Sequence, residues 1–268
     1  MEKHTNEENQ HNYSAKKYRT PDGVPADNII FTITSERTTP NSLPEMNLKV
    51  LMIRRKKWPY AGCWALPGGF SNEDETLLDA AKRELKEETG ISGLQITHLD
   101  VYSTPKRDPR GWIISSAYCA LVNEKYLEHR KAADDAADEQ LFNVNELLSM
   151  IRGDENADFD SNEGKLAFDH HDIINDAFKM IQKQILESNI AKEFLPEEFT
   201  ISELFKVIST VYPELKEIYP KEQLVNFRRK VLTRKLIESV DKESNRNSRR
   251  AAQLYKFSDQ IPVLSHYI

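Results

Sequence analysis

Carboxylates that could hold a metal ion are concentrated in the middle of the N-terminal half. Glu87 and Glu88 lie three and four residues after Glu84, so on a helix the three side chains would share one face. Like charges in this arrangement are mildly destabilising unless solvent or a cation compensates them. Hard oxygen ligands of this kind suit Mg²⁺ or Mn²⁺, which bind a few carboxylates while keeping waters and substrate phosphates. An ordinary solvated face of a charged helix is the alternative.

The surrounding residues predict the helix that would carry these carboxylates. A glycine-rich turn, WALPGGF, precedes residues 76–89, which contain no proline or glycine and favour a helix. Gly90 follows at the position where a glycine commonly ends a helix. Leu78, Ala81 and Leu85 recur with helical spacing on a different face, so we expect them to pack against a core.

The same stretch carries a pattern of seven fixed residues. Written as G-x5-E-x7-R-E-U-x-E-E-x-G-U, with U an aliphatic residue, the pattern runs from Gly69 to Ile91 without a mismatch. It resembles the Nudix box, and the resemblance implies an α/β/α sandwich that hydrolyses a pyrophosphate with the help of Mg²⁺. The residues to which it implies a role are Glu84 and Glu88 as principal metal ligands, Glu87 in support, a carbonyl of Gly68 or Gly69, and Glu75 and Arg83 as orienting side chains.

Length and composition agree with a globular protein of one large or two moderate domains. The chain has 268 residues, of which 30% are charged and 39% hydrophobic, and a net charge of −6. No apolar run approaches membrane-spanning length, and the N-terminus has no signal-peptide segment, so a cytoplasmic protein without a membrane partner is expected. Cys63 and Cys119 are too few for a disulfide framework or a zinc site.

The pattern along the chain predicts an α+β fold in two domains. Strands enriched in β-branched and aromatic residues are expected, and residues 165–187 have the period of a long amphipathic helix. The expected strands cover 28–35, 48–56, 94–103, 112–122 and 139–144. The expected division is a flexible arm over 1–24, a Nudix domain over 25–190 and a winged helix domain over 195–268.

A second candidate site is the sequence RDPRG between two of the expected strands. A surface hairpin tip is its simplest explanation, because Asp, Pro and Gly favour turns. Arg107 and Arg110 could instead clamp a phosphate by bidentate hydrogen bonds, which would make them substrate-binding residues. The pattern resembles Nudix proteins that handle ADP-ribose and their regulatory relatives.

Further acidic residues and two histidines give weaker signals. Nudix hydrolases of the resembling kind often take another carboxylate from a loop, and the candidates here are Asp134, Asp135, Asp138 and Glu139. The sequence does not single one out, and a solvated loop explains each of them. For His170 and His171 a capping or packing contact is favoured, because neither has a metal-ligand neighbour in the sequence.

The chain becomes basic near its C-terminal end. Residues 221–256 contain 11 Lys and Arg against 4 Asp and Glu, a balance typical of a protein that binds a phosphate backbone. Helix, turn, basic helix and basic hairpin resemble a winged helix-turn-helix, whose second helix enters the major groove of DNA. The candidate nucleic-acid contacts are Arg228, Arg229, Arg234 and Lys235 on the second helix and Arg249 and Arg250 in the wing. A dimerisation module with a basic face is the alternative.

Together the two halves resemble the Nudix-related transcriptional regulators of NAD and sugar metabolism and their hydrolase relatives. Many of those regulators have a damaged Nudix box, whereas the box of this chain is complete. We therefore expect a hydrolase that cleaves a nucleoside diphosphate derivative, with ADP-ribose as the expected substrate and Mg²⁺ as cofactor. The alternative is a DNA-binding regulator that senses the same ligand. A homodimer is expected because paired half-sites in DNA need one.

Overall fold

The computed structural model describes residues 20–36, 45–127, 136–151, 165–220, 224–245 and 251–258. A seven-stranded sheet forms the larger unit, with β3, β2, β1, β6 and β5 in that order, β4 beside β1 and β7 beside β2. β1 and β6 run parallel, and the other pairs are antiparallel. Its strands are β1 (Pro25–Glu36), β2 (Glu45–Arg55), β3 (Trp64–Ala65), β4 (Gly68–Phe70), β5 (Thr97–Tyr102), β6 (Ser115–Asn123) and β7 (Ala136–Asn143).

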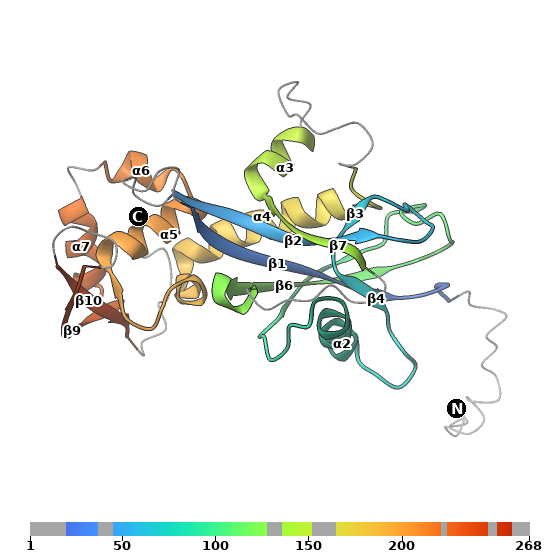
Figure 1. Ribbon diagram of the computed structural model, residues 1–268, viewed down its shortest axis with the longest axis horizontal. Helices are drawn as coiled ribbons and strands as arrows, with labels where there is room; N and C mark the ends of the chain where they lie inside the picture. The colour runs from blue at the N-terminus through green and yellow to red at the C-terminus, as the bar shows by residue number, and fades with distance from the viewer. Residues whose placement is uncertain are drawn as a thin grey trace, which may run out of the picture.

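Helices cover both faces of this sheet. The helices of the unit are α2 (Leu77–Thr89), η1 (Glu124–Leu127), α3 (Val144–Ile151) and α4 (His170–Glu187). α2 lies on one face, and α3 and α4 lie on the other (Figure 1). Alternate residues of β1 follow this division, because Ile30 packs in a cluster with Leu85 of α2 whereas Phe31 packs in a cluster with Ile173 of α4. The predicted α/β/α sandwich is confirmed.

The C-terminal part of the chain forms a smaller unit. Its elements are η2 (Ile190–Phe194), β8 (Phe199–Thr200), α5 (Ile201–Val211), α6 (Leu215–Ile218), α7 (Leu224–Thr233), β9 (Ile237–Ser244) and β10 (Ala252–Phe257). The strands pair in the order β8-β10-β9. α5 begins with a capping box formed by Thr200 and Glu203, which satisfies the free N–H groups of its first turn. Helices followed by a strand hairpin confirm the predicted winged helix arrangement.

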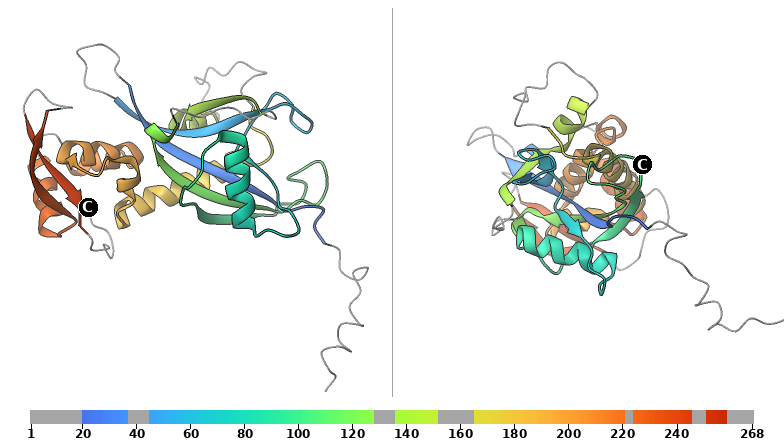
Figure 2. Two further views of the ribbon diagram at one scale, coloured as in Figure 1. Left: turned by 60° about the horizontal axis from the view of Figure 1, so that its bottom comes forward. Right: turned by 90° about the vertical axis from the view of Figure 1, so that its right-hand side faces the viewer.

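One continuous core joins the two units. The buried cluster that contains Ile173 of α4 also contains Val207 of α5 and Phe227 of α7. Gln182 of α4 donates a hydrogen bond to the carbonyl oxygen of Val211 at the end of α5 (3.2 Å). Figure 2 shows α4 running from the sheet toward α5, with the β9–β10 hairpin beyond it. α4 therefore reaches from the sheet to the winged helix unit.

The long helix starts at His170 rather than at residue 165, where the sequence predicts its start. The preceding residues pair with β3 instead: the Trp64 N–H donates to the carbonyl oxygen of Lys165 (2.9 Å), and the Ala167 N–H donates to that of Trp64 (2.8 Å). Phe168 follows with a φ of 55°, which is incompatible with a right-handed helix. Tertiary pairing thus overrides the helical period of this segment.

Two other expectations differ in detail. Leu78 is 38% exposed rather than in the core, because α2 turns Ala80, Ala81 and Leu85 toward the sheet. The end of the expected arm is bonded to the loop before β6: the Asp22 N–H donates to the carbonyl oxygen of Trp112 (2.8 Å), and the Ile114 N–H donates to that of Gly23 (3.3 Å). Among the residues that the structure describes, no helix has both the length and the apolarity needed to cross a membrane.

Candidate functional site

Helix α2 is fixed at three points, so its carboxylates have a defined position. The Thr76 side chain accepts a hydrogen bond from the Asp79 N–H in the first turn (3.1 Å), and Gly90 ends the helix with a φ of 71°. Between these ends, the buried Asn28 side chain of β1 donates to the carbonyl oxygen of Ala81 (3.0 Å). The predicted helix is confirmed, and Asn28 ties it to the sheet.

Arg83 connects the acidic residues of α2 with the loop before it. Its guanidinium donates to Glu75 (2.6 and 3.0 Å), Glu84 (2.5 Å) and Glu87 (3.2 Å), and also to the carbonyl oxygen of Phe70 (3.0 Å). The pKa of Glu75 falls to about 2, mainly because Arg83 donates hydrogen bonds to its carboxylate. The structure thus brings Glu75 and Arg83 together with Glu84, where they can orient it.

Glu84 and Glu88 lie between α2 and the glycine turn. One carboxylate oxygen of Glu88 accepts a hydrogen bond from the Gly68 N–H (2.6 Å). Burial, together with the nearby charges of Glu84 and Asp27, raises the pKa of Glu88 to about 8 despite this bond. Burial likewise raises the pKa of Glu84, against the lowering effect of Arg83. Two partly desolvated carboxylates side by side favour taking up a proton, and a bound cation would instead stabilise their charged forms.

Close contacts explain why the turn contains two glycines. A Cβ atom added to Gly69 would collide with the carboxylate of Glu84, and one added to Gly68 would collide with the carbonyl oxygen of Ala26. Glycine lets the backbone of β4 approach both α2 and β1. Through this approach the Gly68 N–H reaches Glu88.

The carboxylates of α2 fit a hydrated divalent cation. In the part of the chain that the structure describes, no three His, Cys, Asp or Glu side chains are gathered into a ready metal-binding group. Glu87 turns toward Arg83, and 59% of its side chain is exposed. Mg²⁺, however, keeps several waters and usually takes one or two protein carboxylates directly. Glu84 and Glu88, one helical turn apart, offer two carboxylates, the number that such an ion usually takes.

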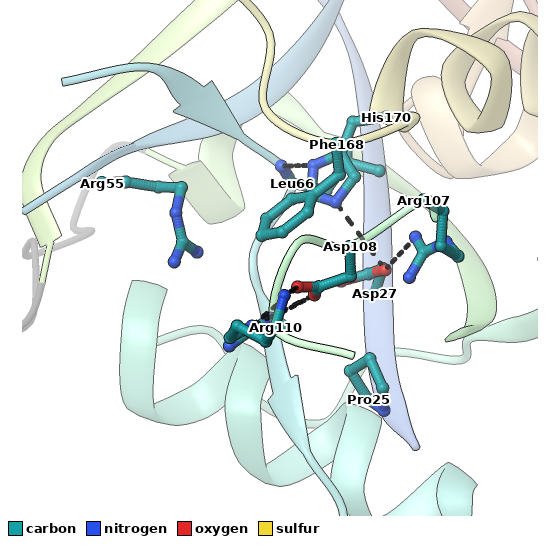
Figure 3. A pocket seen from close by; sticks show the side chains of 10 residues that line it. Pro25, Asp27, Arg55, Leu66, Arg107, Asp108, Arg110, Phe168 and His170 are labelled. Carbon is teal, nitrogen blue, oxygen red and sulfur yellow. Dashed lines mark hydrogen bonds and ion pairs between the residues drawn. The ribbon is translucent and has the colours of Figure 1, made fainter. Parts of the chain in front are cut away.

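A cavity of about 60 Å³ lies beside the glycine turn (Figure 3). It has room for a few waters or a small anion, but not for a whole nucleotide. Charged side chains and one histidine from separate segments meet in it. They come from β1, the end of β2, the loop between β5 and β6, and the start of α4: Asp27, Arg55, Arg107, Asp108, Arg110 and His170.

Arg107 does not lie at an exposed hairpin tip. Its side chain is 3% exposed, and its guanidinium donates two hydrogen bonds to the Asp169 carboxylate just before α4 (2.8 and 2.5 Å). A carboxylate oxygen of Asp27 lies 3.8 Å from a terminal nitrogen of the Arg107 guanidinium. Burial alone would lower the pKa of Arg107, but these carboxylates raise it. The hairpin-tip interpretation is therefore wrong for Arg107, whose bidentate partner is a carboxylate of the protein itself.

Arg110 is more exposed and closes its own turn. Its guanidinium donates to the Asp108 carboxylate (2.6 and 3.0 Å), which also accepts the Arg110 N–H (2.9 Å). Although burial opposes it, Arg110 lowers the pKa of Asp108. The guanidinium lies 4.7 Å from the ring centre of Phe70 and 5.5 Å from that of Phe168.

Arg55, the last residue of β2, is a pocket residue that sequence reasoning missed. Its guanidinium lies 5.0 Å from the ring centre of Phe168, and its Nε donates to the carbonyl oxygen of Pro59 (2.8 Å). Burial lowers the pKa of Arg55, and the nearby charge of Arg110 lowers it further. The available signal was a pair of arginines directly after the apolar residues of an expected strand.

His170 and Asp27 join the pocket to the glycine turn. The Leu66 N–H donates to Nδ1 of His170 (2.9 Å), so the neutral ring carries its proton on Nε2. Nε2 lies 3.8 Å from Asp27, which also accepts a hydrogen bond from the Ser115 hydroxyl (2.5 Å). Burial lowers the pKa of His170. The packing interpretation of His170 is confirmed, whereas the side chain of His171 is partly exposed (39%).

Two of the four further acidic candidates can be placed. Asp134 and Asp135 lie outside the described residues. Asp138 is exposed, and its carboxylate accepts the Glu139 N–H (2.9 Å). Glu139 lies on β7 where this strand pairs with β2, two residues before Leu141. Leu141 packs against the hydrophobic cluster beneath α2. Because alternate residues of a strand share a face, Glu139 lies on the α2 side of the sheet.

Two candidate nucleic-acid contacts lie on the exposed side of α7. Nε of Arg228 donates to the hydroxyl of Tyr255 in β10 (3.0 Å), which ties the helix to the hairpin. Arg229 donates to the Asn226 side chain one turn earlier (3.2 Å). Both arginines are exposed, so their charges remain accessible to a phosphate backbone.

The other candidates are placed differently from the expectation. α7 ends at Thr233, so Arg234 and Lys235 lie in the turn after the helix rather than on it. Lys235 has a φ of 53°, a left-handed conformation that cannot continue a helix. Arg249 and Arg250 lie outside the described residues.

Comparison with protein families gives a match for each unit. The NUDIX domain family matches residues 42–161. This range includes the carboxylate helix α2 and the loop between β5 and β6 that carries Arg107 and Arg110. The NrtR DNA-binding winged helix domain family matches residues 191–257.

Individual proteins resemble either one unit or both. The ADPR responsive transcriptional repressor NtrR of Acinetobacter baylyi is 29% identical over 82% of this chain and 79% of that protein. The ADP-ribose pyrophosphatase of Methanocaldococcus jannaschii is 42% identical over 49% of this chain and 67% of that protein. The crystal structure of Shewanella oneidensis NrtR complexed with a 27mer DNA has a TM-score of 0.64 at 25% identity, covering 88% of this chain and 93% of that one.

Proposed function

Because this chain belongs to the Nudix family and carries an NrtR-type winged helix domain, we propose that it hydrolyses the pyrophosphate of a nucleoside diphosphate derivative. ADP-ribose is the proposed substrate, since a pyrophosphatase of this compound is 42% identical over 49% of this chain. The products would be AMP and ribose 5-phosphate, formed when water attacks one phosphorus atom and the bridging oxygen leaves with the other phosphate.

The complete carboxylate helix carries this proposal. Glu88 is held by the Gly68 N–H, and Glu84 is held by Arg83, which Glu75 in turn fixes. A pure binding domain has no need of this set of oriented carboxylates. Mg²⁺ bound by Glu84 and Glu88 would neutralise phosphate charge and lower the pKa of the attacking water.

Two further contributions come from the residues around the helix. Arg83 and Glu75 keep Glu84 oriented, because an orienting partner fixes the position of a ligand side chain. Glu139 is our choice among the four further acidic candidates, since its register supports a place on the α2 face. Glu87, more exposed than Glu84, would act through waters of the cation.

The experiment that tests the proposal is a product assay on the full-length protein. The panel contains ADP-ribose, NAD, diadenosine polyphosphates and nucleoside triphosphates, each with Mg²⁺ and with EDTA. We expect Mg²⁺-dependent release of AMP from ADP-ribose above all others. Release from another member alone would change the substrate, and no release from any member would leave a ligand sensor.

A second function, DNA-binding regulation, is favoured by the exposed basic side of α7. Arg228 and Arg229 sit on the helix that a winged helix domain places in the major groove. The repressor from Acinetobacter baylyi and the Shewanella oneidensis complex with DNA support this role. We propose a homodimer that binds two half-sites, with a catalytic domain over 25–190 and a DNA-binding domain over 195–268.

The two functions can be tested for coupling by one titration. If ADP-ribose changes the affinity for duplex DNA by some factor, DNA must change the affinity for ADP-ribose by the same factor. Independent sites would give no change in either direction. The titration is carried out with EDTA present, so that the ligand is not consumed.

A further inference from the structure

The three arginines of the cavity differ in how their charges are compensated. Arg107 donates two hydrogen bonds to Asp169, and Arg110 donates to Asp108. For Arg55, no carboxylate within the described ranges lies at ion-pair distance, and its hydrogen bond goes from Nε to a backbone carbonyl (2.8 Å). Figure 3 shows Arg55 and Arg107 on opposite sides of the Phe168 ring. No dashed line joins Arg55 to another of the residues drawn.

Arg55 is nevertheless held in a fixed position. Its guanidinium stacks over Phe168 (5.0 Å), and that ring is itself held by the rings of Tyr60 (4.8 Å) and His170 (5.2 Å). The Nε bond to Pro59 fixes the inner end of the guanidinium plane. An arginine held in this way presents its two terminal amino groups in one plane, which is the geometry for bidentate binding of a phosphate.

Arg55 lies among charges of both signs. The Arg110 guanidinium lies over the same Phe168 ring (5.5 Å), and Asp27 and Asp108 line the same small cavity. Because Arg110 is paired with Asp108, the guanidinium of Arg55 is the one of these two that can still bind an anion. Gly68 also lines this cavity, and its N–H binds Glu88 of the carboxylate helix. An anion beside Arg55 would therefore lie next to the carboxylates proposed to bind the cation, where a substrate phosphate must be.

We propose that Arg55 is the side chain that binds a phosphate of the substrate, and that Arg107 is a positioning residue. This inference rests on the proposed function and specifies it, since it assigns the cavity to a phosphate oxyanion. Arg107 would hold its loop against α4 through Asp169, so that the cavity keeps its shape. From the sequence, Arg107 and Arg110 were expected to clamp a phosphate. In the structure each of them is already paired with a carboxylate of the protein.

Arg54 supplies a matched control for the test. It precedes Arg55 on the same strand, so its side chain leaves the opposite face of β2, where it donates to the carbonyl oxygen of Gly62 (3.2 Å). The variants are Arg55→Gln, Arg55→Lys and Arg54→Gln, each checked for folding by thermal unfolding. Affinities for ADP-ribose, AMP and adenosine are measured by calorimetry with EDTA present, so that no substrate is consumed.

The expected pattern separates phosphate binding from a structural role. Arg55→Gln should weaken binding of ADP-ribose and AMP by about 10- to 100-fold, because charge-assisted hydrogen bonds are removed. Adenosine, which has no phosphate, should be unaffected. The affinity of Arg55→Lys for ADP-ribose and AMP should lie between those of the wild type and Arg55→Gln, because lysine keeps the charge but not the planar fork. Arg54→Gln should stay within about twofold of the wild type.

Equal affinity of Arg55→Gln and Arg54→Gln for ADP-ribose would overturn the inference, as would an equal loss of adenosine binding in Arg55→Gln. A wild-type protein that does not bind ADP-ribose would refute the proposed substrate instead. Inorganic pyrophosphate is then the probe. Binding by the wild type that Arg55→Gln loses would still support the anion site, and the absence of such a difference would overturn it.

Discussion

Arg107 and Asp169 form a bidentate ion pair at the point where the pocket meets α4. Their closest contact is 2.5 Å, and the Arg107 side chain is 3% exposed. Asp169 directly precedes α4, the helix whose far end packs against α5. The pair therefore fixes the loop between β5 and β6 to the helix that reaches the winged helix unit.

Replacing Arg107 by Ala should lower the free energy of unfolding by about 3 to 5 kcal/mol, because it leaves the Asp169 charge without its partner. Lys179→Ala is the control, since Lys179 and Asp176 are 63% and 48% exposed and their pair should contribute about 1 kcal/mol or less. Urea unfolding of both variants measures the difference. Similar losses in the two variants would contradict a structural role for the Arg107 pair.

Gly69→Ala should impair catalysis more than stability. The added methyl group meets the Glu84 carboxylate and must displace it, and misplacing a catalytic group by about 1 Å can cost about 100-fold in rate. Gly93→Ala is the control: its φ of 77° makes the substitution strained, but an added Cβ meets no atom within 4 Å. The control should lose stability and keep its specific activity. The opposite ranking in a Mg²⁺-dependent assay would refute the contact.

Stability should depend on pH through Glu75. Its pKa is about 2 in the folded protein, below the value of about 4.3 for an unfolded chain. The contribution of Glu75 is therefore fully present above about pH 4.3 and is lost as the pH falls toward 2. Glu75→Gln should melt below the wild type at pH 7, and the gap should close in acid. The exposed Glu73→Gln should show no such gap, and a gap for Glu75→Gln that is unchanged at pH 3 would contradict the pairing with Arg83.

The basic face of the winged helix unit should bind DNA phosphates. Replacing Arg228, Arg229, Arg249 and Arg250 by Ala should make the affinity for duplex DNA less dependent on salt. The slope of log affinity against log salt concentration should fall by about 0.9 for each phosphate that the variant no longer neutralises. Ala at four exposed lysines outside α7, namely Lys82, Lys125, Lys179 and Lys183, controls for the loss of four positive charges. A dimerisation module would instead show a changed oligomeric state in light scattering, with an unchanged salt slope.

The fold and the carboxylate helix could be predicted because their signals are local. Thr76, Gly90 and the spacing of Ala81 and Leu85 determine α2 from neighbouring residues alone, and the structure has the helix where they predict it. The five expected strands are also present, with ends that differ from the predicted ones by a few residues, whereas the short strands β3, β4 and β8 were not expected. The early part of the 165–187 segment fails because its pairing with Trp64 depends on a residue far away in the sequence.

The pocket could not be predicted because its members come from distant segments. Asp27, Arg55 and His170 meet only after the sheet forms, and each has an ordinary local explanation in the sequence. Arg107 was singled out by its turn sequence, but its burial against Asp169 depends on where α4 begins. Local patterns thus give elements and spacing, whereas the compensation of each charge depends on tertiary contacts.

Glu84→Gln shows whether the carboxylate helix α2 catalyses hydrolysis. The substitution keeps the shape of the side chain but removes the charge of a proposed ligand, so the melting temperature should barely change. The measurement is the rate of AMP formation from ADP-ribose with Mg²⁺, compared with the wild type and with Glu73→Gln. Glu73→Gln should form AMP at the wild-type rate, and Glu84→Gln should form no Mg²⁺-dependent AMP. Undiminished turnover by a folded Glu84→Gln protein would contradict catalysis by α2.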